Sequence, residues 1–447
     1  MNNIFSTLTF SILLLNPFSA MANQGLSPDG PLTPLGAEKA GNGNDIPAWD
    51  GGLPRSLEGL ESGFHVDPYS SDKPVYRITS RNMEIYDARL SGAQKALLEK
   101  YPSFYMNVYP SRRSASYPDY VYSALRHNLE EATLLPFGSG VKGTVMTSPF
   151  PVPETGLEVL WNHSLRFKGH SAAYSALHTV VSEVGSRMDK LIEYKAYFKY
   201  SEKGLAAENV DNKMFMLIRK TLKPANQSGR AILIHETIDR ISSPRKSWLY
   251  VPGQRRLRRT PNLAYDAPDP NMLAFRTIDQ VDMFNGAPDY YDWKLLGKQE
   301  MYIPYNSYRV HQGSLKVDDI LQDAHINPSL LRYEPHRVWV IEANLRVGYK
   351  HKYTKRRYYL DEDSWSIVYA EDYDSDGELV QISEAHLVNF YEVPLVYSTL
   401  EVTYDLKTGE YYAEGLDNEQ ERTINFLDTG LKEKEFSINA VRMNMIR

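Results

Sequence analysis

The chain has 447 residues and a formal net charge of −6, and its 42% hydrophobic content is enough for a sizeable core. The acidic balance argues against a nucleic-acid partner, which normally meets a basic surface. The chain contains no cysteine, and this excludes disulfides, thiol catalysis, Cys-ligated zinc and a lipid-modified N-terminal cysteine.

Residues 1–22 are predicted to be a secretory signal peptide. The apolar run from Phe5 to Leu15 is too short to span a bilayer, and Ala20 and Ala22 supply the small residues preferred at a cleavage site. We therefore expect an exported protein whose mature form begins near Asn23, with an N-terminal anchor helix as the alternative. No later stretch approaches the roughly 20 apolar residues of a membrane helix, so an integral membrane protein is not expected.

Residues 23–80 are rich in Gly, Pro, Asp and Asn and predict an irregular arm. The arm is either disordered or laid over the body, and its apolar residues, Trp49 above all, favour the docked form. Residues 81–447 are expected to form a single domain. It begins with two amphipathic helices, predicted over 82–101 and 117–135 from apolar residues at helical spacing.

From Gly156 onward the hydrophobic period changes to two, which predicts strands. The clearest strand covers residues 189–200. Consecutive hairpins without intervening helices indicate an antiparallel meander, and a meander this long must curl. Further strands are predicted at 214–222, 231–238, 337–347, 354–360, 365–373 and 378–390, with one more hairpin inside 402–412.

A β-hairpin predicted over residues 246–259 (KSWLYVPGQRRLRR) is the most distinctive stretch. Pro252-Gly253 supplies its turn, and Trp248 and Tyr250 share one face of the first strand. We expect one face to pack on the sheet interior, while the four arginines of the returning strand meet water, carboxylates or a ligand headgroup. The arginines either protect a sheet edge or contact an anionic headgroup or acidic partner. The candidate ligand-binding residues are Trp248, Tyr250, Trp339, Arg255, Arg256, Arg258 and Arg259.

No motif predicts catalysis, a metal site or a cofactor. Asp372, Asp374 and Asp376 are spaced as in a calcium loop, but Ser383 stands where a bidentate glutamate is needed, so a polar turn is predicted. His235-Glu236 opens a zinc-protease pattern without its second histidine. Residues 169–173 (GHSAA) are only a weak match to a hydrolase nucleophile elbow, since we expect no strand-to-helix turn there.

Seven segments resemble the exported proteobacterial family known as domain of unknown function 1329. The resemblance implies a mainly β, α+β fold: a strongly curved antiparallel sheet forming an incomplete LolA/LolB-like barrel with helices across its opening. It also implies a periplasmic location, an apolar ligand such as an acyl chain, and an association with an RND-type exporter and an outer-membrane partner. The segments are LTPLGAEKAGNGNDIPAWDGG (32–52), YPSRRSA (109–115), PFPVPETGLEVLWNH (149–163), WLYVPGQRRLRRTP (248–261), FNGAPDYYDWKLLGKQEMYIPYN (284–306), HRVWVIEANLR (336–346) and YYLDEDSWSIVYAEDYDSDGEL (358–379).

These observations predict a periplasmic binding or transport accessory protein for a hydrophobic or amphipathic, lipid-like ligand. One alternative is a non-catalytic envelope adaptor or structural protein that binds no lipid. A periplasmic hydrolase is a third interpretation, and a glycan ligand stays open because tyrosine-rich strands also suit stacking on sugars.

Overall fold

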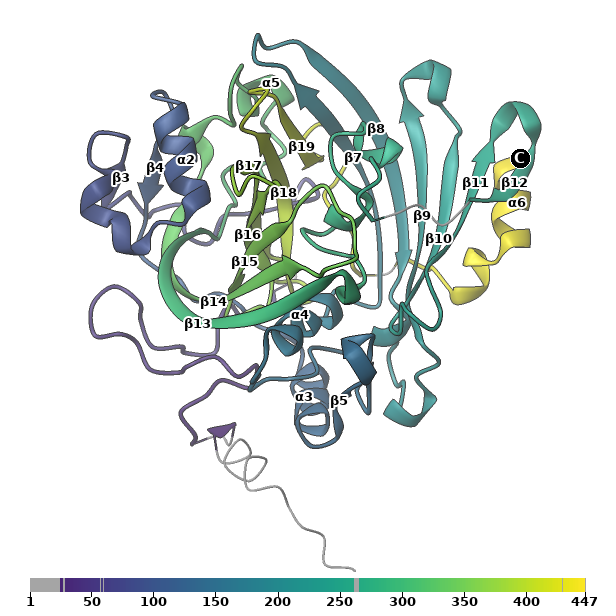
Figure 1. Ribbon diagram of the computed structural model, residues 1–447, viewed down its shortest axis with the longest axis horizontal. Helices are drawn as coiled ribbons and strands as arrows, with labels where there is room; N and C mark the ends of the chain where they lie inside the picture. The colour runs from purple at the N-terminus through teal and green to yellow at the C-terminus, as the bar shows by residue number, and fades with distance from the viewer. Residues whose placement is uncertain are drawn as a thin grey trace, which may run out of the picture.

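The computed structural model describes residues 25–26, 29–56, 58, 60–260, 265–427 and 429–446. The predicted signal peptide, residues 1–22, lies outside the described residues. Within them, fifteen strands form one large, strongly curved sheet that does not close into a barrel (Figure 1). None of the helices in this part of the chain is long and apolar enough to cross a membrane.

The strands follow one another in the order β12-β11-β10-β9-β8-β7-β19-β18-β17-β16-β15-β14-β4-β3, with β13 also paired to β14. Every pair is antiparallel except β14 with β4. The strands are β3 (Tyr76–Ile78), β4 (Met106–Val108), β7 (Ser171–Val181), β8 (Arg187–Tyr197), β9 (Lys213–Lys223), β10 (Ala231–Thr237), β11 (Lys246–Val251), β12 (Arg256–Arg259), β13 (Tyr291–Pro304), β14 (Tyr333–Leu345), β15 (Lys355–Asp361), β16 (Ile367–Tyr373), β17 (Leu379–Asn389), β18 (Val396–Asp405) and β19 (Tyr411–Leu416).

Helices lie around the sheet. In Figure 1, α3 and α4 lie below it, α2 stands beside β3 and β4, and α6 lies alongside β11 and β12. Two short hairpins, β1 (Leu60–Glu61) with β2 (Phe64–His65) and β5 (Thr133–Leu134) with β6 (Val141–Lys142), stand apart from the large sheet. The α-helices are α2 (Gly92–Lys100), α3 (Asp119–Glu131), α4 (Gly156–Leu165), α5 (Val317–Ile320) and α6 (Ile438–Ile446).

The predicted curved antiparallel sheet is confirmed, including the hairpin β11–β12 and the meander from β14 to β19. Two halves of the sheet, β7–β12 and β13–β19, join where β7 pairs with β19. This pairing brings residues 177–181 against residues 411–416. The pairing of β7 with β19 makes the sheet continuous, and no local sequence pattern predicts it.

The expected helix over 82–101 is wrong in its middle. The structure has a 3₁₀ helix, η1 (Met83–Arg89), and then α2, which begins after a new cap at Ser91. The Ser91 hydroxyl accepts from the Gln94 backbone N–H, while the Gln94 side chain accepts from the Ser91 N–H. This capping box starts a second helix inside the apolar stripe. The helix expected over 117–135 is confirmed as the shorter α3.

Strands were expected from Gly156 onward, and this was wrong for residues 156–165, which form α4. A second capping box explains it, because Thr155 and Glu158 cap each other's backbone N–H groups. His163, expected in a β context, therefore lies on a buried helix. Strand β13 was not predicted, because its alternation is broken by a bulge at Gly297, where φ is 105°.

The N-terminal arm is docked on the body. Leu35 and Ile46 are buried. Arg113 links the arm to the sheet: its Nη1 donates to the Glu38 carbonyl at 2.8 Å, and its Nε and Nη2 hold Asp363 at 2.8 and 2.6 Å. The docked arm therefore depends on a fully buried, bidentate ion pair.

We predict that Arg113→Met destabilises the protein by about 3–5 kcal/mol, because it leaves the carboxylate of Asp363 buried without its guanidinium partner. The neighbouring Arg112→Met is the matched control. The Arg112 side chain is 45% exposed and its partner Asp72 is also held by Arg332, so its loss should cost no more than about 1 kcal/mol. Urea unfolding measures both values. Equal losses in the two variants would contradict the prediction.

Candidate functional site

A large cavity of about 800 Å³ lies on the concave face of the sheet. One wall is formed by β10 and β11, where Ile232 and Ile234 project into the cavity and lie opposite Leu249 and Ser247. Alternation along each strand gives all four side chains the same face. The opposite wall belongs to residues 265–290, which contribute Tyr265, Ile278, Ala287, Asp289 and Tyr290.

Residues 265–290, which we call the plug, run through the concavity of the sheet without forming a strand. Buried ion pairs hold the plug to the sheet and to the segment that follows α4. They include Asp269–Arg219 (3.3 Å), Arg276–Glu401 (2.9 Å), Asp279–Arg356 (2.6 Å) and Asp282–Lys168 (2.9 Å). The plug thereby pairs these charges of the concave face, and the cavity beside it is lined by both apolar and polar side chains.

The polar residues around the large cavity carry an excess of positive charge. Arg240 and Arg245 share the single carboxylate of Glu236, at 3.8 and 2.6 Å, while Asp269 is paired with Arg219. Arg230 is exposed and has no ion pair among the described residues. The charged side chains of the lining are Lys190, Arg230, Arg240, Arg245, Asp269 and Asp289.

Burial shifts the pKa of three of these charged groups, and it lowers that of Arg240. Burial lowers the pKa of Lys190, whose Nζ donates to the Pro270 carbonyl at 3.1 Å. Burial raises the pKa of Asp289, whose Oδ1 has no hydrogen-bond partner in the described part of the chain. Lys190 and Asp289 are therefore polar groups that a ligand in this cavity would meet.

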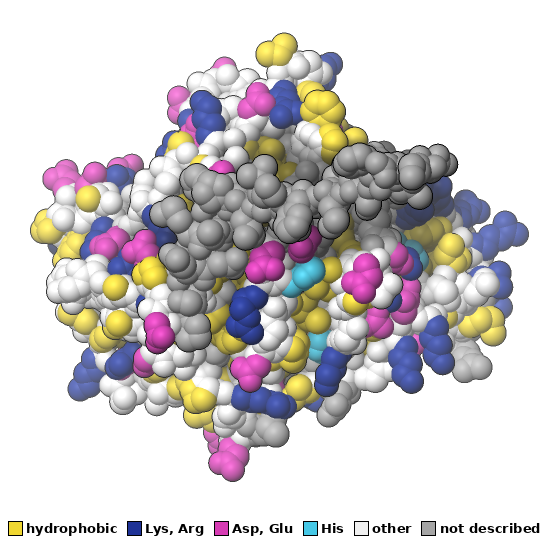
Figure 2. Space-filling model, turned by 90° about the horizontal axis from the view of Figure 1, so that it is seen from below, with side chains coloured by type: hydrophobic (Ala, Val, Ile, Leu, Met, Phe, Trp, Pro, Cys, Tyr) yellow, Lys and Arg dark blue, Asp and Glu magenta, His cyan; other side chains and the backbone are white. Residues whose placement is uncertain are grey.

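The predicted arginines stand at the open edge of the sheet, next to the large cavity. Arg258 lies opposite Leu249 and Arg256 opposite Val251, so both share the cavity face of the hairpin. Arg259 lies opposite Trp248 on the other face, and Arg255 occupies the turn with φ 48°. All four are exposed and make no ion pair with the described residues. Figure 2 shows Lys and Arg side chains gathered at the right-hand end, where Figure 1 places β11 and β12.

The structure does not bring the predicted aromatic residues to the cavity. Trp248 packs in an apolar cluster with Leu257, Phe436 and Val441 on the α6 side of the sheet, and Tyr250 is buried on that same face. The sequence left open which face of the hairpin packs inward, and here α6 covers the Trp248 face from outside. The hairpin residue that lines the cavity is Leu249. The Trp339 ring stacks on that of Trp365, and the Lys298 ammonium lies 4.8 Å from the centre of the Trp339 ring.

A smaller cavity of about 120 Å³ lies further along the same concave face, between the plug and strands β7, β8, β9 and β18. Its wall includes the stacked rings of Tyr174 and Tyr194, 4.6 Å apart. It also includes Glu401 and Glu414, which share the Nη1 of Arg276 at 2.9 and 2.7 Å. One guanidinium therefore serves two buried carboxyl groups.

These two carboxyl groups titrate as a pair. Burial and the charge of Glu414 raise the pKa of Glu401 to about 8. Burial also opposes ionisation of Glu414, but the charge of Arg276 outweighs it and holds the pKa of Glu414 well below its usual range. The pair therefore retains one proton at neutral pH.

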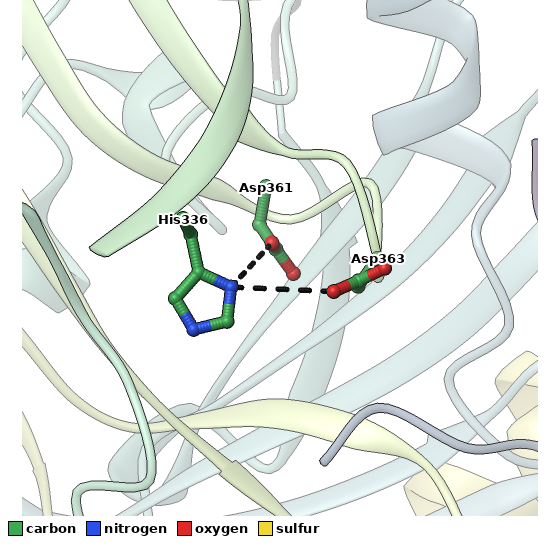
Figure 3. Close-up of side chains that lie close together, drawn as sticks. All are labelled: His336, Asp361 and Asp363. Carbon is green, nitrogen blue, oxygen red and sulfur yellow. Dashed lines mark ion pairs between the residues drawn. The ribbon is translucent and has the colours of Figure 1, made fainter. Parts of the chain in front are cut away.

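Three potential metal ligands come together elsewhere, where His336 of β14 faces Asp361 and Asp363 (Figure 3). The His336 Nδ1 lies 3.8 Å from Asp361 and 4.0 Å from Asp363. Both oxygens of Asp363 are already held by Arg113, and a divalent cation would sit beside that guanidinium. The cluster is therefore explained as part of the ion network that docks the N-terminal arm.

The remaining motifs are accounted for by local structure. The turn predicted at Asp374–Gly377 is confirmed, since the Asp374 side chain accepts from the backbone N–H groups of Asp376 and Glu378. Asp372 is buried and paired with Arg356. His235 bonds the Phe436 carbonyl at 2.8 Å. The Ser171 hydroxyl, at the start of β7, bonds Thr429 at 2.5 Å, which gives no support to a nucleophile elbow.

Several known proteins and one family model are similar to this chain. A family model described as "Protein of unknown function (DUF1329)" matches residues 77–442. "Uncharacterized protein PA3922" of Pseudomonas aeruginosa is 39% identical over 419 residues, which are 93% of this chain and 92% of that protein. Among solved structures, a DUF1329 family protein from Desulfovibrio piger is 12% identical with a TM-score of 0.41, over 61% of this chain and 92% of that one. A LolA superfamily protein from Nitrosomonas europaea is 16% identical with a TM-score of 0.37, over 64% and 98%.

The proton retained by the Glu401–Glu414 pair predicts how the stability of the protein depends on pH. The folded protein holds a proton that an unfolded glutamate, whose carboxyl ordinarily titrates near pH 4.5, loses, so the contribution of Glu401 to wild-type stability should fall as the pH rises from about 5 to about 8. Glu401→Gln removes this loss. The free energy of unfolding of the variant should therefore rise relative to that of the wild type, by at most about 1.4 kcal/mol per pH unit. Melting curves at several pH values measure the difference. A difference that stays constant with pH, as expected for the exposed control Glu378→Gln, would contradict the prediction.

Proposed function

Because the chain belongs to the DUF1329 family of proteins of unknown function, we propose a function from its cavity: it is a periplasmic binding protein for a hydrophobic or amphipathic, lipid-like ligand. The observation that carries this proposal is the cavity of about 800 Å³ beside the plug. Its volume falls in the range of roughly 300–1,000 Å³ that is typical of ligand sites. It is also far larger than the gaps that remain between well-packed side chains.

The walls of the cavity fit an apolar chain. Ile232, Ile234 and Leu249 form a continuous apolar strip across two strands, and Ile278 and Tyr290 face it from the plug. Burial of an apolar chain against such a strip is worth about 25 cal/mol per Å² removed from water. The binding affinity would therefore come mainly from the apolar surface removed from water, with few hydrogen bonds or ion pairs.

The charges fit an anionic end group. Arg256 and Arg258 are exposed on the cavity face of the hairpin, and Arg230 lies in the cavity wall without an ion pair among the described residues. An amphiphile bound with its chain along the apolar strip would bring its headgroup to these arginines. Guanidinium groups bind carboxylate and phosphate through paired N–H donors.

The cellular role in this proposal is that of an accessory to an RND-type exporter with an outer-membrane partner. The resemblance of the sequence segments supports this part, and an exported chain fits it. An envelope adaptor without lipid is the competing function. The two are separated by what the protein carries when it is purified from its own periplasm.

The first test fills the large cavity. Ile234→Trp together with Leu249→Trp should reduce binding of a fluorescent fatty acid at least about tenfold, which corresponds to about 1.4 kcal/mol, because the indoles occupy the strip. Native mass spectrometry should likewise find a co-purified amphiphile on the wild type and little on the variant. Met188→Trp, at a residue 59% exposed on β8, is the control. A wild type purified without ligand but in complex with an envelope protein would favour the adaptor.

The second test concerns the headgroup end. Arg256→Gln with Arg258→Gln should weaken binding of the fatty acid and flatten its dependence on salt, because both arginines lie on the cavity face. Arg255→Gln with Arg259→Gln removes the same charge from the turn and the opposite face, and should leave binding nearly unchanged. Dissociation constants measured across a sodium chloride titration decide it. Equal effects of the two pairs would leave the arginines as a charge that protects the sheet edge.

A further inference from the structure

The tip of the hairpin between β14 and β15 presents two apolar side chains to solvent. Val347 is 103% exposed and Tyr349 is 41% exposed. A tight turn produces this, with the Tyr349 N–H donating to the Arg346 carbonyl at 3.1 Å. Gly348 takes φ 92° in the turn, a conformation that disfavours any side chain there. The backbone therefore holds Val347 out into water.

The residues at and just after the tip are rich in cations. From Arg346 to Arg357 the sequence reads RVGYKHKYTKRR and contains no acidic residue. Lys350 is exposed, and no ion pair links it to another described residue. Lys352 is also exposed, with its ammonium 5.1 Å from the Tyr353 ring centre. Arg346 is paired with Asp292 at 2.7 Å, so the free positive charge of the tip comes from the two lysines.

The tip adjoins the large cavity. The Arg346 N–H donates to the Tyr290 carbonyl at 2.9 Å, and the Arg346 Nη1 to the Asp289 carbonyl at 3.3 Å. The rings of Tyr290 and Tyr349 lie 4.9 Å apart. Because Asp289 and Tyr290 line the cavity, a surface that receives the tip would lie next to the cavity wall.

We propose that residues 346–352 dock on an anionic lipid bilayer, with Val347 and Tyr349 in the headgroup region and Lys350 and Lys352 against lipid phosphates. Tyrosine is favoured at the membrane–water interface, and lysines near an anionic surface add attraction. Two apolar side chains next to two lysines make a surface far smaller than the roughly 800 Å² per partner of a stable protein interface. The proposal extends the carrier function but does not depend on it, since docking is measured without a ligand.

The absence of cysteine in the chain allows a direct test. Val347→Cys, placed in the chain that begins at Asn23, carries an environment-sensitive fluorophore at a single thiol. We expect a blue shift with vesicles of phosphatidylcholine and phosphatidylglycerol (3:1), a much smaller one with pure phosphatidylcholine, and loss of the shift at high salt. Val184→Cys is the matched control, because Val184 is 82% exposed in a turn beside Glu183, and its label should not respond.

Sedimentation with the same vesicles tests the charges without a label. Lys350→Gln with Lys352→Gln should weaken vesicle binding on the order of twentyfold, while fatty-acid binding in the cavity stays unchanged. That separation distinguishes failure of docking from failure of the proposed function. Unchanged sedimentation of this variant, equal shifts from the two labelled positions, or equal binding to both kinds of vesicle would each overturn the proposal. Binding to an acidic protein in place of vesicles would do so as well.

Discussion

The buried ion pairs of the plug are the constraint on which the rest of the concave face depends. A sheet this strongly curved has an interior that residues of several strands must fill, and here charged groups such as Arg219, Glu401 and Arg356 point into it. Each would carry a large desolvation cost if left alone. The plug supplies an opposite charge for each, through Asp269, Arg276 and its other acidic residues.

Ion pairs of this kind add little net stability, because the attraction between the charges roughly offsets their desolvation. Their main effect is to fix the position of the plug relative to the sheet. A pair such as Asp279 with Arg356 is costly to break on one side only, so the plug is held in one place along the sheet. This explains why an irregular segment can serve as the rigid wall of a cavity. The apolar strip on β10 and β11 then faces a defined surface across a space that remains open.

The hairpin β11–β12 shows how one short element serves two environments. Its Trp248 face is closed by α6, while its Leu249 face borders the cavity, and the arginines divide between the two faces in register with them. The tip between β14 and β15 stands across from it on the other side of the cavity wall. In both places positive charge lies beside apolar side chains, in a protein whose net charge is negative. The cavity and its surroundings are thus electrostatically distinct from the chain as a whole.

The sequence by itself determined the fold class, most strands, the hairpin of residues 246–259 and the turn at Asp374. These depend on interactions between residues close in sequence: two-residue alternation, Pro and Gly at turns, and side chains that bond the nearby backbone. The capping boxes at Ser91 and Thr155 were local signals too, and they would have given the correct starts of α2 and α4. The resemblance of sequence segments pointed to the family and to a curved sheet.

Tertiary structure alone decided which face of each strand is concave. Alternation separates Trp248 from Leu249 but does not say which side α6 covers, since that contact joins residues almost 200 positions apart. It likewise could not pair β7 with β19 or place the plug against its charged partners. The candidate arginines could be identified from the sequence because they lie close together along the chain. The cavity they border was not, because its two walls come from residues 230–249 and 265–290 and meet only when the sheet curves.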